Sequence, residues 1–129
     1  MDLAGELGAA EAFSTQRLCL YIPDKDQDGS EVHDYENWVK EAREILSRIG
    51  GGTTALPSAD GTWEKDNGEI LWERTRLVYC FIDPDHFEAN ISNLRSFLHR
   101  FGRETNQGEV VVEFDGRFYR IKSYDEPTE

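Results

Sequence analysis

The sequence predicts an α+β domain in which one antiparallel sheet carries two helices on the same face. Two amphipathic helical patterns alternate with short apolar runs whose side chains point to two faces in turn. Asn-Gly and Asp-Gly pairs separate several of these runs, and such pairs form the tight turns that join antiparallel strands. The length of 129 residues suits a single domain of this class.

The first predicted strand covers residues 17–22, and Pro23 ends it because proline has no N–H for a sheet ladder. A helix is predicted to begin after Asp34 and to end at the glycine run of residues 50–52. Apolar side chains recur along it every three or four residues, which gives one buried stripe. These side chains are Tyr35, Trp38, Val39, Ala42, Ile45, Leu46 and Ile49.

The central part of the chain predicts a hairpin. Residues 53–63 form a broken strand, because Pro57 and the turn at Asp60-Gly61 interrupt the ladder. The turn at Asn67-Gly68 then leads into a long strand over residues 69–82. The last part of that strand is apolar on both faces, which indicates an interior position in the sheet.

A second helix begins at Asp83-Pro84, where aspartate caps and proline occupies the first helical position. Its apolar stripe runs from Phe87 to Phe101, and Gly102 is expected to end it. A terminal hairpin follows over residues 109–122, with a turn at Asp115-Gly116.

The resulting order is β-α-β-β-α-β with an extra C-terminal hairpin strand. Right-handed crossovers turn this order into a split βαβ arrangement, so we predict a ferredoxin-like antiparallel sheet with both helices on one face. Residues 17–122 are expected to form this single domain. Residues 1–16 are interpreted as a flexible acidic arm, and residues 123–129 as an acidic tail.

The chain is strongly acidic. It has 26 Asp and Glu residues against 14 Lys and Arg residues, which gives a formal net charge of −12. Such a surface repels nucleic-acid phosphates and anionic lipids, so we expect neither a nucleic-acid nor a membrane partner. It suits a basic protein partner or a cation. The aromatic side chains expected on the exposed sheet face favour a homodimer as the other possibility.

The two cysteines, Cys19 and Cys80, fall within predicted strands and have the character of buried, reduced thiols. The first 13 residues lack the basic start and apolar run of a signal peptide. No stretch approaches the ~18 apolar residues of a membrane span. These features predict a cytoplasmic protein.

Several short motifs together resemble a family of small bacterial ferredoxin-like domains that have no assigned activity. The resemblance spans about residues 20–121 and implies the fold and a bacterial origin. It rests on Ile22-Pro23, Asp28-Gly29, Gly51-Gly52-Thr53, Gly61-Thr62-Trp63, Phe101-Gly102 and Val110-Val111-Val112.

The loop after the first strand is a candidate metal site. Asp24, Asp26 and Asp28 alternate and precede Gly29, which is how a calcium-binding loop begins. The twelfth position, where such loops carry glutamate, is Tyr35 here. The alternative is a solvated acidic turn. We therefore expect no cofactor, with calcium as the one metal that the sequence suggests.

The central hairpin carries the candidate binding residues. If these side chains project from the open face of the sheet, they form an aromatic platform edged by charges. Packing within a core or across a dimer interface is the alternative interpretation. The residues are Trp63, Trp72, Glu73, Arg76 and Tyr79.

No catalytic motif is present: there is no GxSxG, and Gly50-Gly51-Gly52 leads out of a helix, unlike a phosphate loop. The sequence therefore favours a non-catalytic partner-binding or regulatory module of a bacterial cell. The alternative is a small enzyme with a pocket between sheet and helices. His86, Glu73, Tyr79 and Arg76 would then be its acid-base or anchoring residues.

Overall fold

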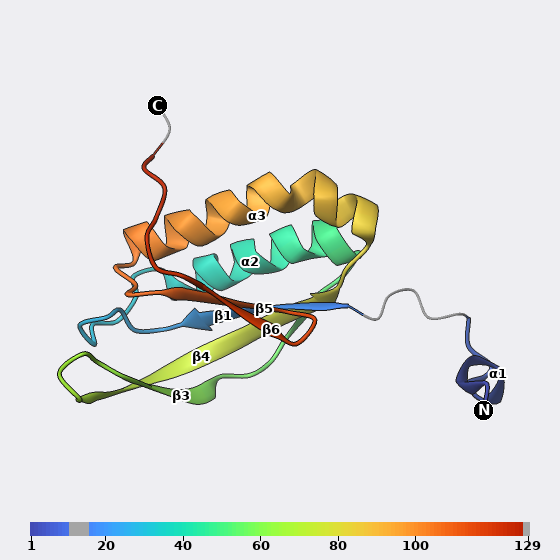
Figure 1. Ribbon diagram of the computed structural model, residues 1–129, viewed down its shortest axis with the longest axis horizontal. Helices are drawn as coiled ribbons and strands as arrows, with labels where there is room; N and C mark the ends of the chain where they lie inside the picture. Colours follow the sequence, from blue (N-terminus) through green and yellow to red (C-terminus); the bar gives the residue numbers. More distant parts are fainter. Residues whose placement is uncertain (11–15, 128–129) are drawn as a thin grey trace.

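The computed structural model describes residues 1–10 and 16–127 of the chain. Helices α2 and α3 lie side by side on one face of a six-stranded antiparallel sheet (Figure 1). This confirms the predicted α+β class with both helices on one face. The elements are α1 (Leu3–Leu7), β1 (Arg17–Pro23), α2 (Tyr35–Gly50), β2 (Thr54–Ala55), β3 (Ala59–Glu64), β4 (Ile70–Phe81), α3 (Pro84–Glu104), β5 (Val110–Phe114) and β6 (Arg117–Ile121).

The sheet order is β2-β4-β1-β5-β6, and β3 also pairs with β4. Strand β1 lies in the middle, where Leu20 pairs with Val78 of β4 and with Val112 of β5. Strands β2 and β3 are separate segments on the free side of β4, with Pro57 between them. Strand β6 extends the opposite side through its hairpin with β5.

The hydrophobic core lies between the sheet and the two helices. Strand alternation directs Leu20, Val78 and Val112 toward the helices, where they are buried. Phe97 and Phe101 of α3 are fully buried, and the Trp38 ring of α2 packs edge-on against Phe101 at 5.3 Å. The predicted pocket between the sheet and the helices is therefore absent from this core, because close-packed side chains fill the layer among the described residues.

Local capping follows the sequence at α3. The Asp83 side chain accepts hydrogen bonds from the backbone N–H groups of Asp85 and His86 at 3.0 and 3.2 Å. Pro84 occupies the first helical position, where no intrahelical N–H partner is required. At the end of α2, Gly51 adopts a positive φ of 84°, which only glycine tolerates easily.

The ends of the chain differ in their contacts. Helix α1 is a five-residue helix at the amino end, within the stretch that the sequence analysis interpreted as an arm. Residues 11–15 of that arm and residues 128–129 of the predicted tail lie outside the described residues. Tyr124 and Asp125, in contrast, contact α3. Within the described ranges, no helix is long and apolar enough to cross a membrane.

Candidate functional site

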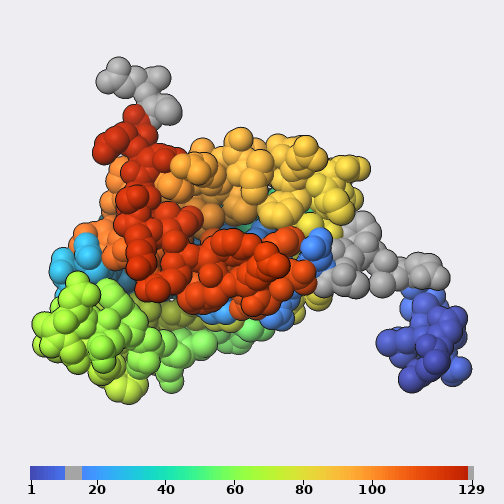
Figure 2. Space-filling model, in the orientation of Figure 1, coloured from blue at the N-terminus to red at the C-terminus, as the bar shows by residue number. Residues whose placement is uncertain are grey.

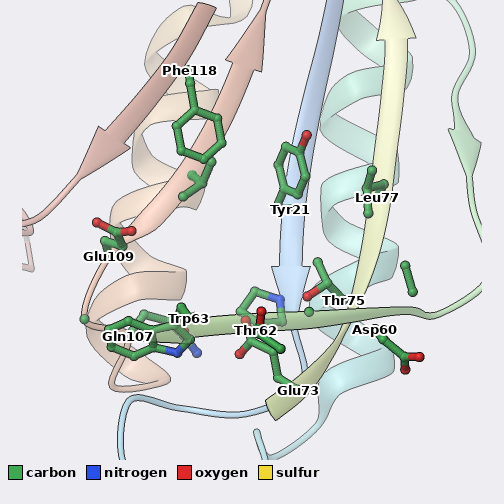
Figure 3. Close-up of a pocket in the computed structure, with 15 residues that line it drawn as sticks. Tyr21, Asp60, Thr62, Trp63, Glu73, Thr75, Leu77, Gln107, Glu109 and Phe118 are labelled. Carbon is green, nitrogen blue, oxygen red and sulfur yellow. The ribbon is translucent and has the colours of Figure 1, made fainter. Parts of the chain in front are cut away.

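A cavity of about 300 Å³ opens on the sheet face opposite the helices (Figure 3). Its floor consists of side chains that alternate away from the core: Tyr21 of β1, Thr75 and Leu77 of β4, and Val111 of β5. Ligand cavities start at about this size, and they combine apolar walls with a few polar groups. This pocket, which we call the open-face pocket, is the candidate site.

One wall of the open-face pocket forms where β3 meets the segment between α3 and β5. Trp63 of β3 lies beside Gln107 in Figure 3. The Trp63 ring also lies against Gly108, where a Cβ would stand 3.4 Å from the ring, at ordinary contact distance. The indole, Gln107 and Gly108 therefore form one continuous wall.

The opposite side of the pocket is aromatic. The rings of Tyr21 and Phe118 pack edge to face, with centroids 6.2 Å apart. The Tyr21 hydroxyl donates a hydrogen bond to Glu113 Oε1 at 2.7 Å, and Arg17 pairs with the same carboxylate at 3.6 Å. Burial and this hydrogen bond raise the pKa of Tyr21 to about 12. The hydroxyl therefore stays protonated, and the Tyr21 side chain that lines the pocket is uncharged.

Glu73 is the most unusual group in the open-face pocket. Among the described residues, none forms a hydrogen bond or ion pair with its carboxylate. Burial, and then the nearby negative charge of Asp24, raises the pKa of Glu73 to about 7. Gly61 of β3 crosses close above it, since a Cβ at position 61 would lie 3.4 Å from Glu73 Cγ.

All the charged groups that line this pocket are negative. Asp60, Glu73 and Glu109 contribute carboxylates, and the described lining contains no Lys or Arg. Arg120, outside the lining, pairs with Glu109 at 2.8 Å, so Glu73 and Asp60 carry the unpaired negative charge. A partly desolvated carboxylate without a counter-charge is stabilised by any cation that enters. Aromatic faces such as Trp63 attract cations as well. The geometry therefore suits a ligand that is flat and apolar in one part and positively charged in another.

Glu73 predicts a specific pH dependence of stability. Its pKa is about 7 in the folded protein and about 4.5 when unfolded, so the folded state holds an extra proton between these values. The free energy of unfolding should therefore fall as pH rises from 4.5 to 7. Glu73→Gln should remove this loss and be more stable than wild type at pH 8, by about 1 to 2 kcal/mol after allowance for solvent screening.

Urea unfolding at pH 5 and pH 8 measures this effect. The matched control is Glu88→Gln on the exposed side of α3, which should follow the wild-type pH dependence. A Glu73→Gln protein that loses as much stability as wild type between the two pH values would contradict the burial of this carboxylate.

The structure brings together two of the residues singled out from the sequence, since Trp63 and Glu73 both line the open-face pocket. Strand alternation turns Trp72 and Arg76 to the other side of β4. Trp72 is 70% exposed there. Arg76 pairs with Glu36 at 3.6 Å.

Tyr79 and His86 lie outside the open-face pocket. Tyr79 is on the open face but packs edge-on against Phe81, with the Arg17 guanidinium above its ring. His86 is exposed in the first turn of α3, on the helix side of the sheet. Of the four acid-base candidates, the pocket thus contains Glu73 alone.

The acidic loop makes hydrogen bonds of its own. Asp26 Oδ1 accepts from the backbone N–H groups of Asp28 and Ser30 at 2.8 and 2.9 Å, and Asp24 accepts from Arg74 N at 3.0 Å. In the part of the chain that the structure describes, no group of three His, Cys, Asp or Glu residues is arranged to hold a metal ion. Calcium binding by this loop stays a prediction.

Sequence reasoning missed much of the open-face pocket. Tyr21 and Thr75 were treated as parts of strands, and Gln107 and Gly108 as a connection. One signal was available: Tyr21 alternates with Leu20 and Ile22, so it must face the side of the sheet away from the helices.

Comparison with known proteins gives a likeness of fold. No family model matches the chain, and no similar curated protein was found. Two solved structures share the fold. A phage SAM lyase in complex with S-methyl-5′-thioadenosine has a TM-score of 0.60 at 14% identity, over 84% of this chain and 89% of that one. A phage SAM lyase in the apo state has a TM-score of 0.61 at 12% identity, over 92% and 97%.

These matches correct the functional interpretation of the sequence. Both structures are of an enzyme, and the likeness covers at least 84% of this chain in each case. The prediction of a non-catalytic partner-binding or regulatory module is therefore wrong. The absence of a recognisable catalytic motif had favoured it, but such motifs are local in sequence, whereas this pocket draws on separate strands.

Proposed function

We propose that this chain is an enzyme that binds and cleaves S-adenosylmethionine (SAM) in the open-face pocket. The observation that carries the proposal is the uncompensated carboxylate of Glu73 in an aromatic-walled cavity, within a fold shared with a SAM lyase. SAM has the two features that this cavity suits. Its adenine is flat and largely apolar, and its sulfonium centre carries a positive charge.

The pocket offers a distinct partner to each feature. The faces of Trp63, Tyr21 and Phe118 provide stacking surfaces for adenine. Glu73 provides the negative charge for the sulfonium, in surroundings that exclude much of the water. The exposed carboxylate of Asp60 at the rim adds to the attraction for a cationic ligand. Glu109 contributes less, because Arg120 already pairs with its carboxylate at 2.8 Å.

The proposed reaction breaks the bond between the sulfonium sulfur and the γ-carbon of the methionine part. Both bonding electrons remain on sulfur, so S-methyl-5′-thioadenosine leaves as a neutral thioether. The four-carbon fragment is completed in one of two ways. Its own carboxylate attacks the γ-carbon and closes a lactone, or a base removes a β-proton and an alkene forms. Glu73 is the pocket base for the second route.

Incubation of the purified protein with SAM tests this proposal. Liquid chromatography with mass spectrometry should detect S-methyl-5′-thioadenosine at a rate proportional to protein concentration and above a SAM-only control. The lactone and the alkene are isomers of equal mass, so ¹H NMR of the second product distinguishes them: only the alkene has vinyl protons. A rate equal to the control, together with no SAM binding by calorimetry, would contradict the proposal.

Ligand charge should determine how binding depends on pH. Glu73 is neutral below its pKa of about 7 and negative above it, so cation binding should strengthen as pH rises from 6 to 8. We expect the Kd for SAM to fall about 10-fold over this range. S-adenosylhomocysteine lacks the sulfonium charge, and its Kd should change less than 3-fold. Calorimetry at the two pH values makes the comparison, and an equal pH dependence for both ligands would argue against an ionic role for Glu73.

We also propose that the protein acts in the cytoplasm. Cys19 and Cys80 support this location, because both are buried free thiols. Burial raises the pKa of each thiol to about 11, so both remain unreactive. A homodimer remains a prediction of the sequence.

A further inference from the structure

The segment after β6 crosses the surface of α3. We call residues 122–127 the C-terminal strap. In Figure 2 it runs from the β5–β6 hairpin up over the carboxyl-terminal half of α3. The ring of Tyr124 fills a notch above Gly102, and any Cβ at position 102 would collide with that ring.

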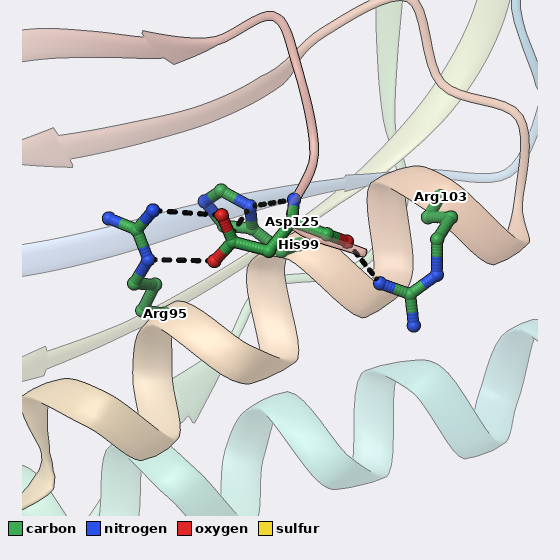
Figure 4. Close-up of polar contacts among 4 residues, drawn as sticks. All are labelled: Arg95, His99, Arg103 and Asp125. Atoms are coloured by element: carbon green, nitrogen blue, oxygen red, sulfur yellow. Dashed lines mark hydrogen bonds and ion pairs between the residues drawn. The ribbon is translucent and has the colours of Figure 1, made fainter. Parts of the chain in front are cut away.

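Polar contacts to α3 hold the strap at Asp125 (Figure 4). The Asp125 N–H donates to Nδ1 of the buried His99 at 2.8 Å. The Asp125 carboxylate accepts hydrogen bonds from Nε and Nη2 of Arg95 at 2.8 and 2.9 Å. This bidentate geometry fixes the orientation of the carboxylate. Arg103 donates to the Asp125 carbonyl at 2.6 Å.

Tyr124 connects this anchored strap to the open-face pocket. Its hydroxyl donates a hydrogen bond to the backbone carbonyl of Gln107 at 2.8 Å. Burial, and then the negative charge of Glu109, raises the pKa of Tyr124 to about 12, so the hydroxyl keeps the proton that it donates. The peptide it contacts continues into Gly108, against which the Trp63 ring lies.

The Gln107 side of the wall has further supports. Its backbone N–H donates to the Gly102 carbonyl at 3.0 Å, and its side-chain amide donates to the Lys25 carbonyl at 3.1 Å. Gly102 is also the residue that the Tyr124 ring covers. The Tyr124 ring therefore contacts the last turn of α3, and its hydroxyl contacts the pocket wall that follows the helix.

We propose that Tyr124 is a positioning residue for the open-face pocket. The contacts of Asp125 with α3 hold Tyr124 in place. The Tyr124 hydroxyl then fixes the position of residues 107–109, against which Trp63 packs. The part of the inference that concerns ligand binding rests on the proposed function. The part that concerns the position of residues 107–109 rests only on the contacts of Tyr124.

Tyr124→Phe tests the inference, because it removes the hydroxyl and keeps the ring over Gly102. Hydrogen–deuterium exchange of the Gln107 amide should become about 5-fold faster, since one supporting hydrogen bond is lost. The Kd for S-methyl-5′-thioadenosine should rise about 5-fold, and the KM for SAM should rise with little change in kcat. Tyr119→Phe on β6, outside the pocket, is the matched control and should leave all three values unchanged.

Two outcomes would overturn the inference: unchanged exchange of residues 105–109 in Tyr124→Phe, or faster exchange with unchanged ligand affinity. Failure of the proposed function gives a different result. Wild-type protein would then bind neither S-methyl-5′-thioadenosine nor SAM, whereas faster exchange in Tyr124→Phe would still support the role of Tyr124 in holding the wall.

Discussion

Glu73→Gln is expected to lower kcat/KM for SAM cleavage by about 100-fold. The substitution keeps the shape of the side chain and removes the pocket carboxyl whose pKa burial raises to about 7. An ion pair or a proton transfer in a partly desolvated site contributes about 100-fold in rate or more. Initial rates of S-methyl-5′-thioadenosine release at pH 8 measure the effect.

The control for this prediction is again Glu88→Gln, which changes the same net charge on an exposed helix surface. It should retain wild-type kcat/KM. Because Glu73→Gln is expected to be more stable than wild type at pH 8, unfolding cannot explain its loss of activity. A Glu73→Gln enzyme within 3-fold of wild type would exclude Glu73 from the reaction.

Phe101→Ala is expected to give the largest loss of stability, a fall in the free energy of unfolding of about 3 to 5 kcal/mol. The Phe101 side chain is 0% exposed. It packs against the rings of Trp38 and Phe97, at centroid distances of 5.3 and 6.3 Å, where the two helices meet the sheet. Truncation leaves a cavity that these large rings cannot fill. Urea unfolding at pH 7 provides the measurement.

Phe81→Ala is the matched control, because it removes the same atoms from a ring that is 48% exposed at the end of β4. Its cost should be about 1 kcal/mol, since much of the ring already contacts water. Equal losses for the two variants would contradict the placement of the core between the sheet and the helices.

Local patterns predicted the elements of this fold because their causes are local. Leu18, Leu20 and Ile22 alternate with other residues, as a strand requires, and Asp83-Pro84 starts α3 through contacts within one turn. Pro57 separates β2 from β3 for the same kind of reason. Each feature depends on a few neighbouring residues, so the sequence shows it directly.

The candidate site depends on tertiary structure, which single-sequence patterns do not contain. Trp63 and Glu73 were singled out and do line one pocket, but they were grouped with Trp72, which alternation places on the opposite face of the hairpin. Gln107 reaches the pocket only because the chain turns back after α3 and enters β5, which lies between β1 and β6. The high pKa of Glu73 comes from burial, and burial has no local sequence signal.

The most direct test of the central claim is a ¹H–¹⁵N NMR titration of the protein with S-methyl-5′-thioadenosine. A ligand in the open-face pocket should shift the backbone amides of Gly61 and Gly108 and the indole N–H of Trp63. It should leave the indole N–H of the exposed Trp72 unchanged. Saturable shifts at the first three positions would support the pocket as the site of a SAM-cleaving enzyme. Shifts confined to other parts of the chain, or no shifts at millimolar ligand, would contradict it.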